Sequence, residues 1–155
     1  MKSYVVNPTD GSLVSVEDWK KTENPTSAEL VALLDEQTGK GLLIAKNVLG
    51  DYKFAEAQKV AAEYTNPAGG TFRCPTRREA LDIYDSRFTG LDEAIAAVGG
   101  TPISGKWYWT ADSDPDPECS YLSAFFFNGY TGGVYTNSKD SAYSVRPVSA
   151  FEQNN

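Results

Sequence analysis

The amino-acid sequence predicts one domain of the α+β class, with two to three helices beside short antiparallel sheets. Three observations support this. The 155 residues suffice for one compact domain with a full core. Helical periodicity falls within residues 52–99, and short aromatic and β-branched runs separated by Gly, Asn, Asp and Pro follow residue 106. Because strands and helices do not alternate along the chain, this order favours α+β over a parallel βαβ arrangement.

The first 27 residues are interpreted as an irregular lead-in, followed by a domain over 28–155. Apolar runs at Tyr4–Val6 and around Leu13–Trp19 are separated by the turn signal "NPTDG". Because the segment shows no helix or sheet of its own, its apolar side chains need a surface to cover them. That surface is either the sheet edge of the same domain or another protein chain.

A β-hairpin is predicted over residues 28–47. Two apolar runs, Leu30–Leu34 and Leu42–Ala45, flank "EQTGKG", whose glycines supply the positive φ angles of a turn. A helix follows in "YKFAEAQKVAAEY", where apolar side chains recur at helical spacing until "NPAGG" ends it.

Two further helices are expected in the middle of the chain. Thr76 followed by Glu79 has the form of a capping box, which predicts a helix start there. The apolar face of this helix is expected to consist of Ala80, Leu81, Tyr84 and Phe88. A short third helix lies in "TGLDEAIAAVGG", with Gly99 placed to end it.

Strands are predicted in the second half, at residues 107–110, 123–128, 133–137 and 143–148. Alternation places Trp107 and Trp109 on one side of the first strand and Tyr108 on the other. Trp109 is expected in the core, whereas Tyr108 suits either the core or an exposed aromatic platform. In "FFF", the side chains of Phe125 and Phe127 should face away from that of Phe126.

The composition excludes several classes of function. The chain has no histidine, so the usual catalytic triads and most zinc sites are ruled out. Cys74 and Cys119 are far apart and fit no zinc or CxxC spacing. A net charge of -7 repels nucleic acid, and no apolar stretch is long enough for a membrane span or a signal peptide. We therefore expect no cofactor, no nucleic-acid partner and no membrane insertion.

The acidic segment "DSDPDPE" suggests a calcium loop only in part. Asp112, Asp114 and Asp116 have the first three spacings of an EF-hand. Pro117 stands where that loop needs glycine, and Ser123 stands where it needs a bidentate glutamate. The pattern favours a solvated anionic loop without metal.

The stretch "AFFFNGYTGGVYTNSKDSAY" favours a binding surface. It is rich in Tyr, Ser, Asn and Gly, as antibody paratopes are, although turns alone use similar residues. The expected ligand-binding residues of the chain are Tyr108, Asp112, Asp114, Tyr130, Tyr135, Asn137, Lys139 and Tyr143. Arginines can clamp anions, but more often tie loops together. Structural roles are therefore expected for the two arginines. The same role is expected for the capping-box residues and the two tryptophans of the first strand, which gives the set Arg73, Thr76, Glu79, Trp107, Trp109 and Arg146.

Four segments in order resemble a bacterial and phage domain of C-type-lectin-like fold: "GLLIAKNVLGDYKFAEAQ", "FRCPTRREALDIYD", "GKWYWTADS" and "AFFFNGYTGGVYTNSKDSAYSVRPVSAF". The resemblance covers roughly residues 40–151, and Cys74 stands where leucine is common. It implies helices beside an antiparallel sheet, termini that approach each other, and a binding face on the late strands and loops. The domain is similar to adhesin domains of gut bacteria and to ligand-binding proteins that phages diversify.

The same fold includes oxidases, so the function must be argued from the residues, and these favour no catalytic site. We expect a non-enzymatic binding or structural module of a phage virion or an extracellular surface assembly, made in the cytoplasm. Its expected partners are a protein or glycan receptor on a cell surface, other virion or surface-assembly proteins, and further copies bound through residues 1–47. Two alternatives remain. A formylglycine-generating oxidase needs closely spaced cysteines, and a calcium-dependent lectin typically uses Glu-Pro-Asn and Trp-Asn-Asp segments, which this sequence lacks.

Overall fold

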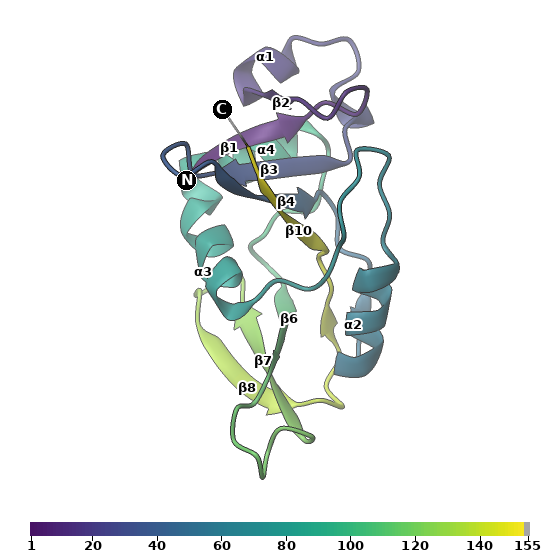
Figure 1. Ribbon diagram of the computed structural model, residues 1–155, viewed down its shortest axis with the longest axis vertical. Coiled ribbons are helices and arrows are strands. Elements are labelled where there is room, and N and C mark those ends of the chain that lie inside the picture. Colours follow the sequence, from purple (N-terminus) through teal and green to yellow (C-terminus); the bar gives the residue numbers. More distant parts are fainter. Residues whose placement is uncertain (154–155) are drawn as a thin grey trace.

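The computed structural model describes residues 1–153 and combines helices with two sheets, so the α+β class is confirmed (Figure 1). Sheet A has the strand order β10-β4-β3-β1-β2, and sheet B has the order β5-β9-β6-β7-β8. The strands of sheet A are β1 (Lys2–Val6), β2 (Leu13–Val14), β3 (Leu30–Leu34), β4 (Lys40–Ala45) and β10 (Val148–Glu152). Those of sheet B are β5 (Asp51–Tyr52), β6 (Trp107–Ser113), β7 (Ser123–Asn128), β8 (Val134–Ser138) and β9 (Tyr143–Ser144).

The helices occupy different sides of the molecule, with α3 on one side and α2 on the other (Figure 1). Neighbouring strands pair antiparallel, apart from a short parallel contact between β6 and β9. The helical elements are α1 (Val16–Lys20), a 3-10 turn (Pro25–Ser27), α2 (Phe54–Glu63), α3 (Arg77–Ser86), a π-helical turn (Arg87–Leu91) and α4 (Asp92–Ala97).

The amino-terminal segment is part of the domain, which corrects the expected lead-in over residues 1–27. Strand β1 pairs with β3 from Lys2↔Leu34 to Val5↔Val31 and also with β2. Val5 and Trp19 are buried in the core, and the Trp19 indole N–H donates to the Pro25 carbonyl at 2.8 Å. The covering surface is therefore the domain's own sheet, because β1 fills the edge that β3 would otherwise expose.

Local signals in the next segments are confirmed. Strands β3 and β4 form the predicted hairpin, with Leu34 opposite Gly41 and Gly39 at φ +76° in the turn. In α2, the side chains of Phe54, Ala57 and Ala61 are buried. The end of β10 pairs with β4, so both ends of the described chain lie in sheet A.

Helix α3 begins as predicted but buries a different face. Thr76 and Glu79 form a reciprocal capping box. Ala80 and Ile83 are buried, whereas Leu81 is 44% and Phe88 79% exposed. The predicted apolar face is therefore right for Ala80 and wrong for Leu81 and Phe88, and Phe88 lies beyond the helix, which ends at Ser86. In the π-helical turn that follows, Gly90 adopts φ +124°, which redirects the chain into α4.

The two faces of sheet B contribute to different cores. Tyr108 and Phe127 pack with Ile83 and Leu91 in the core that α3 and α4 share with sheet A. Trp109 and Phe126 pack instead against α2, in a second core around Phe54, Ala57 and Tyr143. Trp107, on the same face as Trp109, is 44% exposed and lies outside this second core.

Candidate functional site

Strand β6 shows the predicted alternation of its three aromatic residues. Both tryptophan rings contact the Tyr143 ring, whereas Tyr108 stacks on Phe127 at a centroid distance of 4.7 Å. The Tyr108 hydroxyl donates to the Ile103 carbonyl at 2.8 Å, and burial raises the pKa of this phenol. Because Tyr108 is only 1% exposed, its expected role as a ligand-binding residue is corrected to a core role.

Trp107, Phe126, Tyr135 and Tyr143 form a connected group on one side of sheet B, here called the aromatic face. Phe126 lies at its centre, with ring centroids 4.6 Å from Tyr143, 5.6 Å from Trp107 and 6.1 Å from Tyr135. Trp107 is 44% and Tyr135 56% exposed, whereas Phe126 and Tyr143 are buried beneath them. Trp107, expected to be structural, therefore lies at the surface.

The aromatic face is anchored in the core around α2. The Trp109 ring packs edge-on against Tyr143 at 4.7 Å and against Phe54 at 5.3 Å. The Trp109 indole N–H donates to the Tyr52 carbonyl at 2.8 Å. Edge-on and stacked aromatic contacts of this kind hold ring orientations. The exposed rings of Trp107 and Tyr135 therefore rest on an ordered support.

A hollow of about 540 Å³ borders the aromatic face beside Trp107. Tyr130, Lys106 and Asp51 contribute to its lining, and the Ser144 hydroxyl donates to the Asp51 carboxylate at 2.6 Å. The hollow thus combines aromatic rings with one cationic and one anionic side chain. Lys106 precedes Trp107 directly in the sequence, but Asp51 reaches this place only because β5 pairs with β9.

Asn137 and Lys139 are tied to neighbours in the same domain. The Asn137 side-chain amide donates to the Tyr143 hydroxyl at 2.6 Å. The Lys139 ammonium group donates to the Ser120 carbonyl and lies 5.0 Å from the Phe54 ring centroid. These expected ligand-binding residues hold the support of the aromatic face in place.

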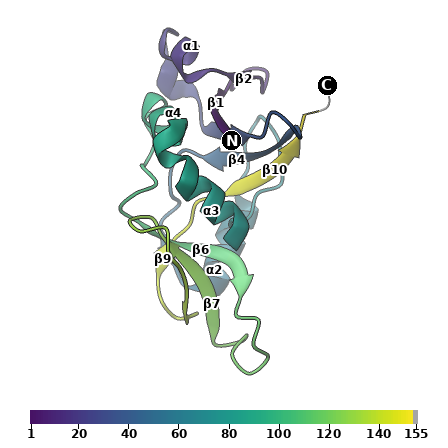
Figure 2. The same cartoon turned by 90° about the vertical axis from the view of Figure 1, so that its left-hand side faces the viewer.

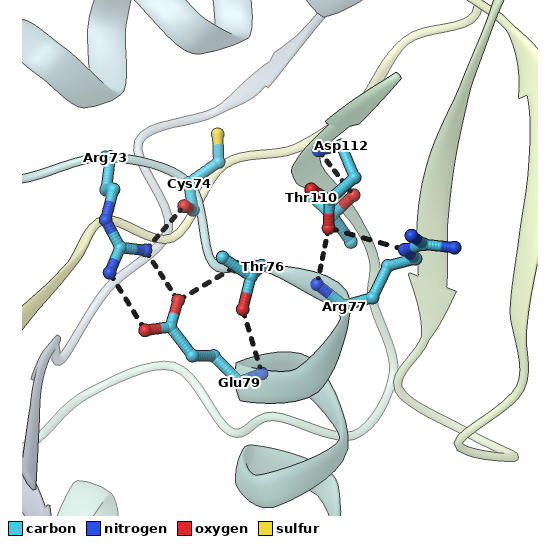
Figure 3. A network of polar contacts seen from close by, with 7 residues as sticks. All are labelled: Arg73, Cys74, Thr76, Arg77, Glu79, Thr110 and Asp112. Carbon is cyan, nitrogen blue, oxygen red and sulfur yellow. Dashed lines mark hydrogen bonds and ion pairs between the residues drawn. The ribbon is translucent and has the colours of Figure 1, made fainter. Parts of the chain in front are cut away.

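The acidic residues lie away from the aromatic face. Asp112 accepts a hydrogen bond from the Arg77 backbone N–H at 2.8 Å and so supports the first turn of α3, on the opposite side of sheet B (Figure 3). Asp114 accepts from the Asp116 backbone N–H at 3.0 Å, within a loop at the far end of sheet B from sheet A (Figure 2). The geometry thus separates Asp112 and Asp114 from the expected ligand-binding residues at the aromatic face.

A polar network fixes the start of α3 (Figure 3). The Arg73 guanidinium donates to both oxygens of the Glu79 carboxylate, at 2.5 and 2.9 Å. The same carboxylate accepts from the Thr76 backbone N–H at 2.8 Å, and the Thr76 hydroxyl accepts from the Glu79 backbone N–H at 3.2 Å. Burial opposes the charge of Glu79, but the bonds from Arg73 and Thr76 outweigh it and lower its pKa. Arg73, Thr76 and Glu79 therefore bond to one another and hold the first turn of α3, which is the structural role expected for them.

Arg146 is buried and ties three segments together. Its guanidinium donates to the carbonyls of Ala45 (3.0 Å), Lys46 (2.8 Å) and Thr101 (2.6 Å). Because all these partners are neutral backbone groups, the arginine closes loops around the hairpin and leaves no nitrogen directed at solvent.

The two cysteines are free thiols in different environments. Cys74 is buried before α3, and burial raises its pKa to about 12. In Cys119, burial and the nearby carboxylates of Asp116 and Asp114 also raise the pKa. Because the thiolate is the reactive form, neither thiol is activated for nucleophilic chemistry. In the part of the chain that the structure describes, no three His, Cys, Asp or Glu side chains gather so that they could hold a metal ion.

A wider groove of about 930 Å³ lies between α3 and sheet A. Its floor includes Leu42 and Phe151, and Arg78, Asp82 and Glu152 stand along it. None of the expected ligand-binding residues lies in this groove. Of the expected ligand-binding residues, Tyr130, Tyr135, Asn137 and Tyr143 lie at the aromatic face or its hollow.

Comparison with known proteins adds no assignment. No protein-family model matches the chain, and no curated protein matches it in sequence. Over residues 1–153, none of the helices has the length and apolar character needed to span a membrane.

Proposed function

We propose that this chain is a non-enzymatic binding module of C-type-lectin-like fold, part of a phage virion or an adhesive cell-surface assembly. Its ligand is a protein or glycan receptor on a cell surface, bound at the aromatic face and the adjoining hollow. The fold assignment is supported by the order of the four sequence motifs and by helices that flank antiparallel sheets. The binding role is supported by the geometry of the aromatic face.

The observation that carries the proposal is the exposure of two large aromatic side chains on an ordered support. Trp107 and Tyr135 are about half exposed, yet both rings contact the buried ring of Phe126. Rigid aromatic side chains lose little entropy on binding and dominate the energetics of many interfaces. Sugar rings and apolar side chains of a protein both fit such a platform, and Asp51 and Lys106 offer polar contacts at its border.

Loss of the exposed rings tests the proposal. Labelled wild-type chain and the double variant Trp107→Ala/Tyr135→Ala are compared on panels of whole bacterial cells and on a glycan array. Phe88→Ala/Tyr121→Ala is the matched control, since it also removes two exposed aromatic side chains. We expect the first variant to bind at least about tenfold more weakly and the control to bind like wild type. Equal binding by all three proteins contradicts the proposal.

Two other functions can be distinguished directly. A calcium-dependent lectin gains stability from calcium, because a ligand that binds only the folded state raises the melting temperature. We expect millimolar calcium to leave the melting temperature unchanged, because Asp114 and Asp116 already accept local backbone hydrogen bonds.

An oxidase of the formylglycine-generating type converts a cysteine-containing peptide to an aldehyde with copper, which mass spectrometry detects. We expect no conversion.

A further inference from the structure

Within residues 1–153, strand β8 forms one edge of sheet B and pairs only with β7 (Figure 1). Its five residues, "VYTNS", contain no charge, no proline and no glycine. Proteins usually protect exposed edge strands with charges, prolines, bulges or covering segments. No such protection lies within β8 itself.

The register shows which backbone groups of β8 face outward. The Asn128 N–H donates to the Gly133 carbonyl at 2.9 Å, and the Lys139 N–H donates to the Leu122 carbonyl at 2.8 Å. In an antiparallel pair, hydrogen-bonded positions alternate with non-bonded ones. Tyr135 and Asn137 therefore direct their backbone groups toward β7. Val134, Thr136 and Ser138 direct theirs away from the sheet.

The outward groups of Ser138 already have partners within the chain. Its N–H donates to the Asn137 side-chain oxygen at 2.8 Å, and its carbonyl accepts from the Ser141 N–H at 3.0 Å. At the other end, the Gly132 N–H donates to the Asn128 carbonyl at 2.7 Å. Among residues 1–153, nothing satisfies the outward backbone groups of Val134 and Thr136. The open part of the edge thus consists of two residues, Val134 and Thr136, one on each side of Tyr135.

We propose that β8 pairs antiparallel with β8 of a second copy of this chain, about a two-fold axis at Tyr135. Val134 of each copy then lies opposite Thr136 of the other, and each N–H donates to the carbonyl opposite. Tyr135 meets Tyr135 of the second copy in a non-bonded position, where side chains approach most closely. The free groups are self-complementary in this register, which is why the occupant is another copy.

The other edges of the two sheets are less suited to such pairing. Strand β10 is also an edge, but it carries the charged Glu152, and Arg73 already pairs with Val148 there. Strands β2 and β5 are two residues long. Strand β1, within the region expected to mediate self-association, pairs with β2 on one side and β3 on the other. The fold therefore places self-association at β8.

Pairing through β8 joins the aromatic faces of the two copies on the same side of one continuous sheet. Their distance is then fixed by the sheet, so a receptor that displays repeated ligands meets two sites at once. Such bivalent attachment strengthens binding without new contacts. Each copy carries a net charge of -7, so long-range repulsion opposes pairing, and added salt should strengthen it.

Charge substitutions at Tyr135 test both the pairing and its register. The molar mass of the full chain is measured by sedimentation and light scattering from micromolar to millimolar concentration. We expect wild type to form dimers, and more at higher salt. Tyr135→Glu alone and Tyr135→Lys alone should each weaken dimers by about tenfold or more, because like charges then face each other. An equimolar mixture of the two variants should form heterodimers.

Thr136→Pro provides a second test at the backbone. Proline removes the outward N–H of Thr136 but no hydrogen bond to β7, so the fold should persist. Tyr121→Ala serves as a control, because it removes an exposed aromatic ring outside the strand. We expect Thr136→Pro to abolish the dimer and Tyr121→Ala to retain it, both with wild-type circular dichroism. A wild type that is monomeric at every concentration overturns the proposal, as does a Tyr135→Glu and Tyr135→Lys mixture that forms no heterodimers.

Discussion

Strands β3 and β8 have the same length and belong to sheets of the same size, yet their environments are opposite. All five residues of β3, "LVALL", are buried, whereas four of the five residues of β8 are exposed. β3 lies between β1 and β4, and β8 lies at an edge. The comparison shows that the two strands have different roles. The central strand of sheet A is buried on both faces and stabilises the fold, whereas the edge strand of sheet B presents side chains to solvent.

Strand β7 and the segment after β9 connect the buried core at sheet A with the exposed part of sheet B. Strand β7 places Phe127 in the core shared with sheet A and Phe126 under the aromatic face. Arg146 follows β9 and binds the carbonyls beside the hairpin of sheet A. The exposed rings are therefore mounted on elements that the main core holds rigid. This allows β8 to vary in sequence with little effect on the fold.

The largest contrast should appear when one residue is truncated in each strand. Leu33→Ala removes a fully buried side chain in β3 and should lower the free energy of unfolding by about 2–5 kcal/mol. Thr136→Ala in β8 should change it by less than about 0.5 kcal/mol. Chemical denaturation of both variants, at concentrations where the chain is monomeric, measures the difference. Similar losses in the two variants would show that β8 is not a free edge.

Removing the Arg146 guanidinium should have the next largest effect on stability, because it breaks the hydrogen bonds that join the segment after β9 to the segments after β4 and α4. Arg146→Met fills similar space but leaves the carbonyls of Ala45, Lys46 and Thr101 without their donor. We expect the free energy of unfolding to fall by about 2–4 kcal/mol. Arg146→Lys should recover only part of this loss, since one ammonium group cannot match the guanidinium fork. Full stability in Arg146→Met, measured by thermal and chemical denaturation, would contradict this role.

The elements that could be predicted from the sequence are those with local signals. The hairpin follows from two apolar runs around a glycine turn, and the start of α3 follows from Thr76 and Glu79. Alternation correctly separated Trp107 and Trp109 from Tyr108. In each case the spacing along the chain determines the geometry, so no knowledge of distant partners is needed.

The elements that were missed depend on distant partners. The short apolar run of β1 has no local turn that joins it to β3, so its place in sheet A was not visible. The burial of Tyr108 depends on Ile83 of α3, and the π-helical turn at Arg87–Leu91 places Phe88 outside that helix. Asp51 lines the hollow only through the pairing of β5 with β9. Periodicity shows on which face of a strand or helix a residue lies, but not which part of the chain covers that face.

Loss of one charge at Glu79 should cause a smaller and pH-dependent effect. Glu79→Gln weakens the bidentate pair with Arg73, and we expect a loss of about 1–2 kcal/mol at neutral pH. The pKa of Glu79 lies below its ordinary 4.5 in the folded protein. Its stabilisation is therefore present above about pH 4.5 and is lost as the pH falls through the folded-state value. Glu56→Gln, in the first turn of α2 and exposed, is the matched control.

The pH dependence distinguishes the charged network from simple packing. Wild type and Glu79→Gln should approach each other in stability as the medium becomes acidic, because protonation of the carboxylate removes what the variant lacks. Melting temperatures between neutral and acidic pH measure this convergence. A constant gap across the whole range would show that the carboxylate charge contributes nothing.

The smallest effect on stability is expected at Tyr135, where the proposed functional effect is large. Tyr135→Thr keeps a residue suited to a strand and removes a ring that is 56% exposed. Because Phe126 stays covered on its other side by Tyr143, the free energy of unfolding of the monomer should change by less than about 0.5 kcal/mol. Denaturation at low concentration measures this change, and binding on the cell and glycan panels is measured with the same sample. A loss above about 1 kcal/mol would assign the Tyr135 ring to the packing of sheet B. Unchanged stability with weakened binding would show that β8 is held by its backbone pairing with β7 and that its side chains are free to serve recognition.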